Sequence, residues 1–404
     1  MNTINVGILG LGTVGAGVLT ILRQPHPDLA GLNFRVTRAA VRHVTAAREQ
    51  KYPEIALTTE PQSIVTDPHI QVVVEVMGGV ESTWPLLKTA LTQGKHVITA
   101  NKDLIAQHGD ELSTIARAHS VALFYEAAVM GGVPILHTLT HTYANDRIHR
   151  LVGIANGTSN FILSQMHQAG RTYQEALTLA QQKGFAEADP TNDVAGIDAA
   201  YKLTILARLA FGVHPSAQDI NCQGIAGLSP TDFTAATHWH QVIKPLIVAD
   251  QQQGSLALTV SPFAIPQNHP LCRIDNENNG IVINSANFQE MLLAGPGAGA
   301  LPTAGSVIAD LATVGHAIQA QRVPVFAPLI AVGPSLLPPE AYRAQRFLAW
   351  QGSTLPDTLP VIDRQISANG IIYALTQSVS VAEVRLWQEK YPTQLLRQFP
   401  VLSD

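Results

Sequence analysis

The sequence predicts an α/β protein with an N-terminal, doubly wound parallel sheet, an α+β second domain and a small C-terminal α+β module. Three observations lead to this prediction. Short β-branched runs alternate with helix-period stretches over residues 1–134, a glycine-rich turn follows the first run, and the rhythm changes from about residue 135. Regular β–α alternation predicts parallel strands, because each strand is followed by a crossover helix.

The elements of residues 1–134 alternate in chain order. Aliphatic and β-branched runs predict the strands, and apolar residues at helical spacing predict the helices. They are a strand at residues 4–9, a helix at 14–22, strands at 34–41 and 72–76, a helix at 82–93, a strand at 96–100, a helix at 104–119 and a strand at 121–125.

Residues 135–300 are predicted to form the second domain. Several consecutive helical stretches replace the β–α alternation, and short apolar runs punctuated by proline and asparagine follow them. The predicted elements are a strand at residues 147–154, helices at 160–169, 173–183 and 196–211, and further strands between residues 251 and 287.

The end of the chain is predicted to form three segments. The glycine-rich loop at residues 295–299 opens a helix over 301–323 that returns to the first domain. A proline-rich stretch, 324–339, is typical of a linker, and residues 340–404 form a third module.

Composition excludes several classes of protein. The net charge of −5 comes without a basic block, so no nucleic-acid partner is expected. Cys222 and Cys272 form no CxxC motif, which argues against a disulfide framework or a thiolate metal site and favours the cytoplasm. Glycines interrupt the apolar N-terminus, so we expect neither a signal peptide nor a membrane anchor.

The glycine-rich turn predicts a dinucleotide site of the Rossmann type. It follows a strand and opens a helix, so its glycines allow a tight turn and close approach of the backbone to a pyrophosphate. The helix N-terminus then faces the anion. The predicted cofactor-binding residues of this turn are Gly10, Gly12, Thr13, Val14 and Gly15.

The end of the second strand favours NADP over NAD. NAD-binding proteins usually place an acidic residue there, whereas this chain has Arg42, which suits a 2′-phosphate. Arg48 and Lys51 would assist it. The competing interpretation is that Arg42 is only a solvated residue at the end of the strand and binds no phosphate. NAD therefore remains the alternative cofactor.

Polar residues after the strand at 96–100 predict the nicotinamide end of the site. Ligands of open α/β sheets bind beyond the carboxyl ends of the strands, which is where Thr99 and Lys102 lie. Gly299, from the loop before the last helix of the first domain, is included among the cofactor-binding residues.

Charged residues on an almost wholly apolar helix predict a substrate site. Asp198 and Lys202 are spaced i,i+4 and share a face, and Glu187 and Asp193 lie just upstream. Carboxylates accept hydrogen bonds from a substrate ammonium, and a lysine can exchange a proton with an alcohol. The alternative is a purely structural ion pair.

A second helix N-terminus would hold a substrate carboxylate. Asn156, Gly157 and Thr158 follow the strand at 147–154 and present amide and hydroxyl donors. An ordinary helix cap is the alternative interpretation.

These residues belong to motifs by which the sequence resembles the homoserine dehydrogenase family up to about residue 320. The motifs occur in the family's order. They are GLGTVG at 10–15, VVVEVMGG at 72–79, GKHVITANK at 94–102, YEAAVMGGVPI at 125–135, NGTSNFIL at 156–163, GFAEADPTNDVAGIDAAYKLTILA at 184–207 and GPGAGALPTAGSVIADL at 295–311.

The resemblance implies NAD(P)-dependent, reversible interconversion of L-homoserine and L-aspartate 4-semialdehyde in threonine and methionine biosynthesis. It implies proton transfer by Lys102 and Lys202. It also implies that Asp198 and Glu187 hold the substrate's amino end, that Asp193 supports them, and that the second domain forms a homodimer.

The resemblance further implies a monovalent cation site, usually for sodium, which would order the hinge and take no part in the chemistry. By position its ligands are the Glu126 side chain and backbone oxygens of Val129, Gly131 and Val133. A plain strand end with a glycine turn is the competing interpretation.

Residues 340–404 resemble an ACT domain, a βαββαβ regulatory fold, but in degenerate form. The glycine turn expected within residues 346–357 is missing, while a helix at 358–368 and a strand at 371–375 still fit. We therefore expect a structural or dimer-forming module more than threonine feedback.

Two other functions compete with this interpretation. One is another amino-acid semialdehyde-type dehydrogenase, but an acyl-phosphate-forming enzyme needs a nucleophilic cysteine, and neither cysteine lies in such a motif. The other is a non-catalytic nucleotide-binding regulator in which Lys102 and Lys202 form only ion pairs.

Overall fold

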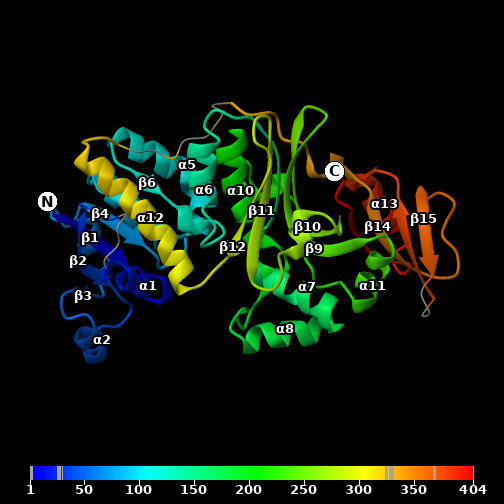
Figure 1. The fold of residues 1–404 in the computed structure, drawn as a ribbon, viewed down its shortest axis with the longest axis horizontal. Helices are drawn as coiled ribbons and strands as arrows, with labels where there is room; N and C mark the ends of the chain where they lie inside the picture. Colours follow the sequence, from blue (N-terminus) through cyan, green and yellow to red (C-terminus); the bar gives the residue numbers. More distant parts are fainter. Residues whose placement is uncertain are drawn as a thin grey trace. The chain divides into compact units, whose positions relative to one another are not determined.

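The computed structural model describes residues 3–24, 29, 31–323, 326, 332–366 and 370–403 (Figure 1). The chain divides into two compact units. The first unit consists of Met1–Ala144 and Pro296–Leu329, and the second of Asn145–Gly295 and Ile330–Asp404. None of the described helices combines the length and the apolar character needed to cross a bilayer.

The first unit is built on a six-stranded parallel sheet, which confirms the predicted doubly wound fold. Its strand order is β3-β2-β1-β4-β5-β6. The strands are β1 (Thr3–Leu9), β2 (Asn33–Ala40), β3 (Ala56–Thr58), β4 (Val72–Glu75), β5 (His96–Thr99) and β6 (Leu123–Phe124). The order reverses at β1, so the carboxyl ends of β1 and β4 form the switch point where ligands bind.

Helices connect the strands of this sheet. They are α1 (Thr13–Leu22), α2 (Ala46–Lys51), α3 (Gln62–Val65), α4 (Trp84–Thr92), α5 (Lys102–Ala118), the 3₁₀-helix Glu126–Ala128, α6 (Ile135–His137), the π-helical segment Thr138–Thr142, and α12 (Ala300–Gln319). Figure 1 shows α12 lying along α1. The approach is so close that a Cβ on Gly17 would lie 2.5 Å from the Ala300 carbonyl oxygen.

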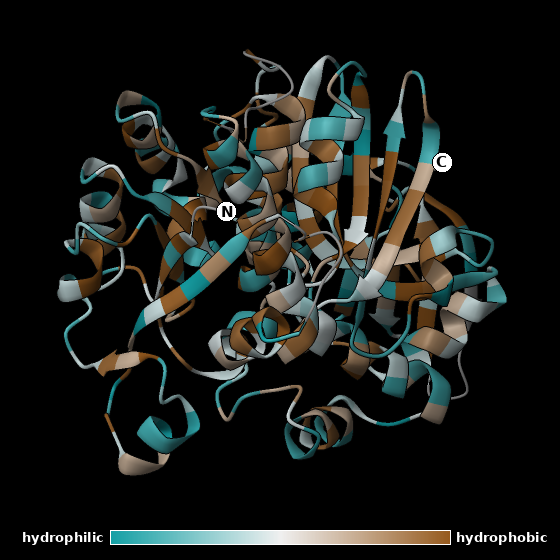
Figure 2. Cartoon of the chain, turned by 60° about the vertical axis from the view of Figure 1, so that its left-hand side comes forward, coloured by the Kyte–Doolittle hydropathy of each residue, from teal (hydrophilic) through white to brown (hydrophobic). Residues whose placement is uncertain are grey.

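The second unit contains a mixed six-stranded sheet in the order β12-β11-β7-β9-β10-β8. Its strands are β7 (Ile148–Ile154), β8 (Asn221–Cys222), β9 (Gln241–Gln252), β10 (Ser255–Pro266), β11 (Asn278–Ser285) and β12 (Gln289–Pro296). Its helices are α7 (Gly157–Ala169), α8 (Tyr173–Gln182), α9 (Thr191–Val194), α10 (Ile197–Phe211) and α11 (Pro230–His238), with short turns at Ala217–Asp219 and Pro270–Arg273. Figure 2 shows hydrophobic residues along many of the strands, consistent with the buried β9 and β10.

The C-terminal part adds a four-stranded antiparallel sheet, β15-β16-β14-β18, to the second unit. Its elements are the turn Pro339–Ala341, β13 (Arg343–Ala344), β14 (Arg346–Gln351), β15 (Val361–Ile366), β16 (Ile371–Thr376), β17 (Val379–Ser380), α13 (Val381–Lys390) and β18 (Leu395–Pro400). This is the strand order of a βαββαβ fold without its first helix. The prediction of a helix at residues 358–368 is wrong, because β15 occupies most of that stretch and pairs with β16.

The C-terminal sheet is an integral part of the second unit. On one face Phe347, Tyr373 and Phe399 join a buried cluster with residues of α7 and α11, among them Phe161 and Phe233. The other face packs Leu348, Trp350 and Ile372 against Trp387 of α13.

The segment predicted as a linker, residues 324–339, lies partly outside the described residues. At its far end the amide of Leu337 donates to the Leu256 carbonyl, and Leu336 forms a β-bridge with Leu256. The described end of this segment therefore packs along β10.

Candidate active site

The glycine turn after β1 forms one wall of a cavity of about 550 Å³ in the first unit. Gly10 has φ +100°, and Gly12 is the N-cap of α1, which begins at Thr13. A Cβ on Gly15 would lie 2.2 Å from the Gly10 carbonyl oxygen, so only glycine lets the helix approach the turn. Beside Gly12 the space is open, which leaves room for a phosphate at the helix N-terminus.

Two arginines line the same cavity. Arg42 follows β2 and is exposed, and Arg48 from α2 joins it, while no aspartate or glutamate is among the described residues that line the cavity. Donors of this charge suit a phosphate better than they suit ribose hydroxyls alone.

The ends of β4 and β5 carry a buried polar cluster in the first unit. The Thr99 hydroxyl donates to Glu75 Oε2 at 2.5 Å, and Asn101 caps α5 by accepting from the Leu104 amide at 3.2 Å. Lys102 is the first residue of α5, and its Nζ lies 3.6 Å from Asp103 Oδ1. Sequence reasoning missed Glu75, although an acidic residue closing an apolar strand is an unusual feature.

Lys202 of α10 is buried in the second unit. Its Nζ donates to the Ala155 carbonyl at 2.6 Å and to Asp198 Oδ2 at 2.8 Å. Gly196, with φ +84°, is the N-cap of α10, so Asp198 lies in the first turn, where a carboxylate is favoured. The i,i+4 pair predicted from the sequence is thus formed in the structure.

Asn156 joins the acidic residues of this site. Its Nδ2 donates to Asp193 Oδ1 at 2.7 Å and to Asp198 Oδ2 at 2.8 Å, while its Oδ1 caps α7 by accepting from the Ser159 amide. Burial raises the pKa of the Asp193 carboxyl, and the nearby Asp198 carboxylate raises it further. The amide nitrogen of Asn156 is therefore used to hold two carboxylates side by side.

The other predicted substrate-binding residues lie near this network. Gly157 and Thr158 begin α7, whose first-turn amides have no acceptors within the helix. The Thr158 hydroxyl donates to the Phe185 carbonyl at 2.6 Å. Glu187 is exposed, and among the described residues its carboxylate makes no hydrogen bond with Asp198 or Lys202.

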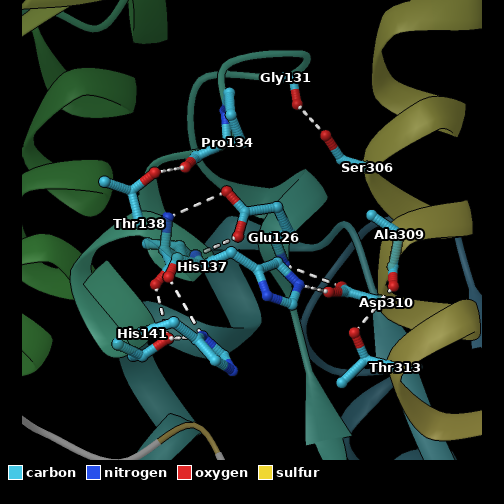
Figure 3. Close-up of polar contacts among 12 residues, drawn as sticks. Glu126, Gly131, Pro134, His137, Thr138, His141, Ser306, Ala309, Asp310 and Thr313 are labelled. Carbon is cyan, nitrogen blue, oxygen red and sulfur yellow. Dashed lines mark hydrogen bonds and ion pairs between the residues drawn. The ribbon is translucent and has the colours of Figure 1, made fainter. Parts of the chain in front are cut away.

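The predicted cation ligands lie in the first unit, after β6, and Figure 3 shows two of them, Glu126 and Gly131. The Glu126 carboxylate accepts from the amides of Leu136 at 2.9 Å and His137 at 2.6 Å. His137 Nε2 lies 2.8 Å from Asp310 Oδ1. Burial raises the pKa of Glu126 to about 7, and the Asp310 carboxylate raises it as well.

The other predicted cation ligands, Val129, Gly131 and Val133, and the predicted cofactor-binding residue Gly299 do not line the 550 Å³ cavity. The Gly131 carbonyl accepts from the Ser306 hydroxyl at 2.6 Å, and Val129 and Val133 are buried on either side of it. Gly299 is the N-cap of α12, with φ +120°.

A parallel sheet with a glycine turn at its switch point is the architecture of nicotinamide-dependent oxidoreductases, and a buried lysine paired with a carboxylate suits a substrate that carries an alcohol and an amine. Comparisons with known proteins identify the family. Residues 10–126 match the model "Homoserine dehydrogenase, NAD binding domain" and residues 134–312 the model "Homoserine dehydrogenase". The chain belongs to the homoserine dehydrogenase family and is an oxidoreductase with a nicotinamide-dinucleotide-binding domain.

Individual relatives agree with the family models. The homoserine dehydrogenase of Bacillus subtilis is 42% identical over 318 residues, which cover 78% of this chain and 73% of the relative. A crystal structure of a homoserine dehydrogenase from Thiobacillus denitrificans superposes with a TM-score of 0.92 at 35% identity, covering 100% of this chain and 99% of that one. A hyperthermophilic archaeal homoserine dehydrogenase in complex with NADPH has a TM-score of 0.67 at 26% identity, covering 78% and 98%.

Proposed function

We propose that the chain interconverts L-homoserine and L-aspartate 4-semialdehyde, with Lys102 and Lys202 serving proton transfer. The observation that carries the proposal is the buried ammonium of Lys202, held by Asp198 and the Ala155 carbonyl. A buried charge on an apolar helix costs free energy, and a catalytic use beside the carboxylates that Asn156 holds, Asp193 and Asp198, would account for its presence.

Proton transfer follows from the ordinary chemistry of lysine. When the aldehyde is reduced, the ammonium group donates a proton to the oxygen on C4 as negative charge develops there. In the oxidising direction the neutral amine takes up the hydroxyl proton. The nicotinamide, when bound, exchanges a hydride with C4, so the alcohol loses one hydride and one proton in total.

The polar ends of the substrate match the donors and acceptors of the second unit. Asp198 and Glu187 would accept from the substrate ammonium, and Asp193 would support them through Asn156. The first-turn amides of Gly157 and Thr158 would donate to the substrate carboxylate.

The 550 Å³ cavity fits NADP, with NAD as the alternative. The open space beside Gly12 would take the pyrophosphate, and Arg42 with Arg48 would hold the 2′-phosphate. Thr99 and Lys102 lie at the carboxyl end of the sheet, where the nicotinamide would bind. NADPH in the archaeal relative supports this choice.

We expect Arg42→Ala to weaken NADP binding about tenfold or more while changing NAD binding little, because only NADP carries the 2′-phosphate that the guanidinium would pair with. Fluorescence titration with NADPH and NADH gives both dissociation constants. Arg35→Ala, which removes an arginine from β2 outside the cavity lining, is the control. Equal weakening of both cofactors would contradict the assignment of Arg42.

A monovalent cation such as sodium fits the residues after β6. Glu126 and Asp310 are two buried carboxylates; backbone amides donate to Glu126, and the His137 imidazole is a side-chain partner of Asp310, so the segment is rich in acceptor oxygens. The Gly131 carbonyl retains one lone pair after accepting from Ser306. Glu126 with the backbone oxygens of Val129, Gly131 and Val133 would hold the cation and order this segment.

The same family membership supports a proposal for the assembly and the location. A homodimer is proposed through the second unit, whose edge strand β12 exposes Leu292 at 40% and leaves a sheet edge available for pairing. The cytoplasm is the proposed location, and homoserine and aspartate semialdehyde are the proposed small-molecule partners.

Steady-state kinetics test this function. We expect homoserine-dependent formation of the reduced nicotinamide, faster with NADP than with NAD. Because the C-terminal module lacks the first helix and glycine turn of an ACT domain, added threonine is expected to leave the rate unchanged. Cofactor binding without turnover would favour a non-catalytic regulator, and activity only with another amino-acid alcohol would favour a related dehydrogenase.

A further inference from the structure

Glu75 is a completely buried carboxylate at the switch point of the first unit's sheet. It ends β4, whose preceding residues Val72, Val73 and Val74 are all buried, and its own exposure is 0%. Removing a carboxylate from water is costly unless donors surround it. The hydrogen-bond donors that surround Glu75 therefore indicate its role.

The carboxylate joins the ends of two neighbouring strands. Oε1 accepts from the backbone amides of Met77 at 2.7 Å and Gly78 at 3.0 Å, and Oε2 accepts from the Thr99 hydroxyl at 2.5 Å. Met77 and Gly78 line the dinucleotide cavity. Gly78 and Gly79 have φ +75° and +78°, a region that glycine enters freely, so hydrogen bonds rather than side-chain sterics fix this turn in one conformation.

The same contacts continue to the first turn of α5. The Asn101 amide donates to the Thr99 hydroxyl oxygen at 3.0 Å, and Asn101 Nδ2 donates to the Gly79 carbonyl at 2.6 Å. Asn101 also caps α5, which begins at Lys102. Glu75, the glycine turn, the end of β5 and the start of α5 thus form a closed ring of hydrogen bonds.

We propose that Glu75 is a positioning residue for the reaction: it holds the turn Met77–Gly79 and Thr99 in one arrangement, and through Asn101 it orients Lys102 toward the reacting oxygen. The inference rests on the proposed function, because it assigns Lys102 to proton transfer. A residue that only stabilised the sheet would make the same hydrogen bonds but would not be coupled to Lys102.

Glu75→Gln is the central variant. The glutamine side chain fills the same space and keeps one oxygen for the two backbone amides. Its NH₂ group then faces the Thr99 hydroxyl, which loses its acceptor. We expect kcat to fall about tenfold, the worth of one hydrogen bond to a charged group, and the KM for NADPH to rise severalfold. Thr99→Val, which removes that hydroxyl, should reproduce the loss of kcat.

Coupling to Lys102 separates positioning from stability. In a Lys102→Ala background, Glu75→Gln should lower kcat by no further factor, because the group it orients is already gone. Asp232→Asn is the control: Asp232 is also 0% exposed and accepts from a backbone amide, that of Ser229, but it lies in the second unit and is paired with Arg397. It should lower Tm, keep kcat, and show no coupling to Lys102.

The outcomes distinguish this inference from the proposed function. Two results would overturn the role of Glu75 and leave the proposed function intact. One is a further tenfold loss of kcat in the Glu75→Gln, Lys102→Ala double variant relative to Lys102→Ala. The other is normal kinetics in Glu75→Gln when Lys102→Ala is impaired. Normal turnover in Lys102→Ala would overturn the role of Glu75 together with the assignment of Lys102 to proton transfer, and would leave that transfer to Lys202. If Glu75→Gln fails to fold, Thr99→Val and its double variant with Lys102→Ala carry the same test.

Discussion

Lys202→Ala is expected to lower kcat about 100-fold or more, because general acid–base catalysis by a positioned group contributes at least this much. The structure fixes the position of the Lys202 ammonium group, as proton transfer requires. Its Nζ is held by Asp198 Oδ2 at 2.8 Å and by the Ala155 carbonyl at 2.6 Å, so the ammonium has a defined position. Stopped-flow and steady-state measurements of NADPH oxidation with the semialdehyde would give the loss.

The matched control for this variant is Lys244→Ala. Lys244 is 3% exposed, and its Nζ donates to the Ile274 carbonyl at 2.8 Å and to Asp275 Oδ1 at 2.6 Å, the same two kinds of acceptor that hold Lys202, although Asp275 is more exposed than Asp198. Removing one partner of a buried pair destabilises a protein by roughly 3–5 kcal/mol. Both variants should therefore lose Tm, and only Lys202→Ala should lose kcat.

A purely structural ion pair makes a different prediction. Under that hypothesis Lys202→Ala and Lys244→Ala would lower Tm to similar extents and leave turnover per folded molecule near normal. A small primary amine added to the assay sharpens the comparison, since it can replace a missing proton-transfer group. Partial restoration of kcat in Lys202→Ala, with none in Lys244→Ala, is the expected pattern.

The sequence predicts the first unit's sheet well because its signals are local. A glycine turn between a strand and a helix carries its own geometry, and the apolar runs of β1, β4 and β5 need no partner to be recognised. The three-residue β3 was missed, because so short a strand has no periodicity and forms only by pairing with β2.

Long-range contacts in the candidate site could not be read from spacing. The pair Asp198 and Lys202 follows from helical periodicity, but the two hydrogen bonds from Asn156 to Asp193 and Asp198 join residues 37 and 42 positions apart. Asn156 was predicted to bind substrate from its place at a helix start. Its actual partners depend on how α7, α9 and α10 pack.

The C-terminal module shows where a family pattern misleads. Residues 358–368 were assigned a helix by resemblance, yet Val361 and Ile362 are β-branched, Pro360 precedes them, and the stretch pairs with β16. β-branched residues lose side-chain freedom in a helix and pack well on a sheet. The residue types were therefore a better guide than the position in the motif.

Lys102→Ala is also expected to lower kcat about 100-fold, since the same class of proton transfer is assigned to it. Lys102 is more accessible than Lys202, with 30% of its side chain exposed, so little change in Tm is expected. Lys88→Ala is the control. Its Nζ lies 3.5 Å from Glu111 Oε1 on the same unit, much as Lys102 Nζ lies 3.6 Å from Asp103, and its loss should leave kcat unchanged.

Combining the two lysine variants tells whether both serve one step. If Lys102 and Lys202 act on the same substrate oxygen, the Lys102→Ala, Lys202→Ala double variant should be about as slow as the slower single variant, because groups that act as a unit are not additive. Losses that multiply, to about 10,000-fold, would mean that each lysine stabilises the transition state independently. Near-normal turnover in Lys102→Ala would instead leave proton transfer to Lys202, with Lys102 beside the nicotinamide only as a charged neighbour.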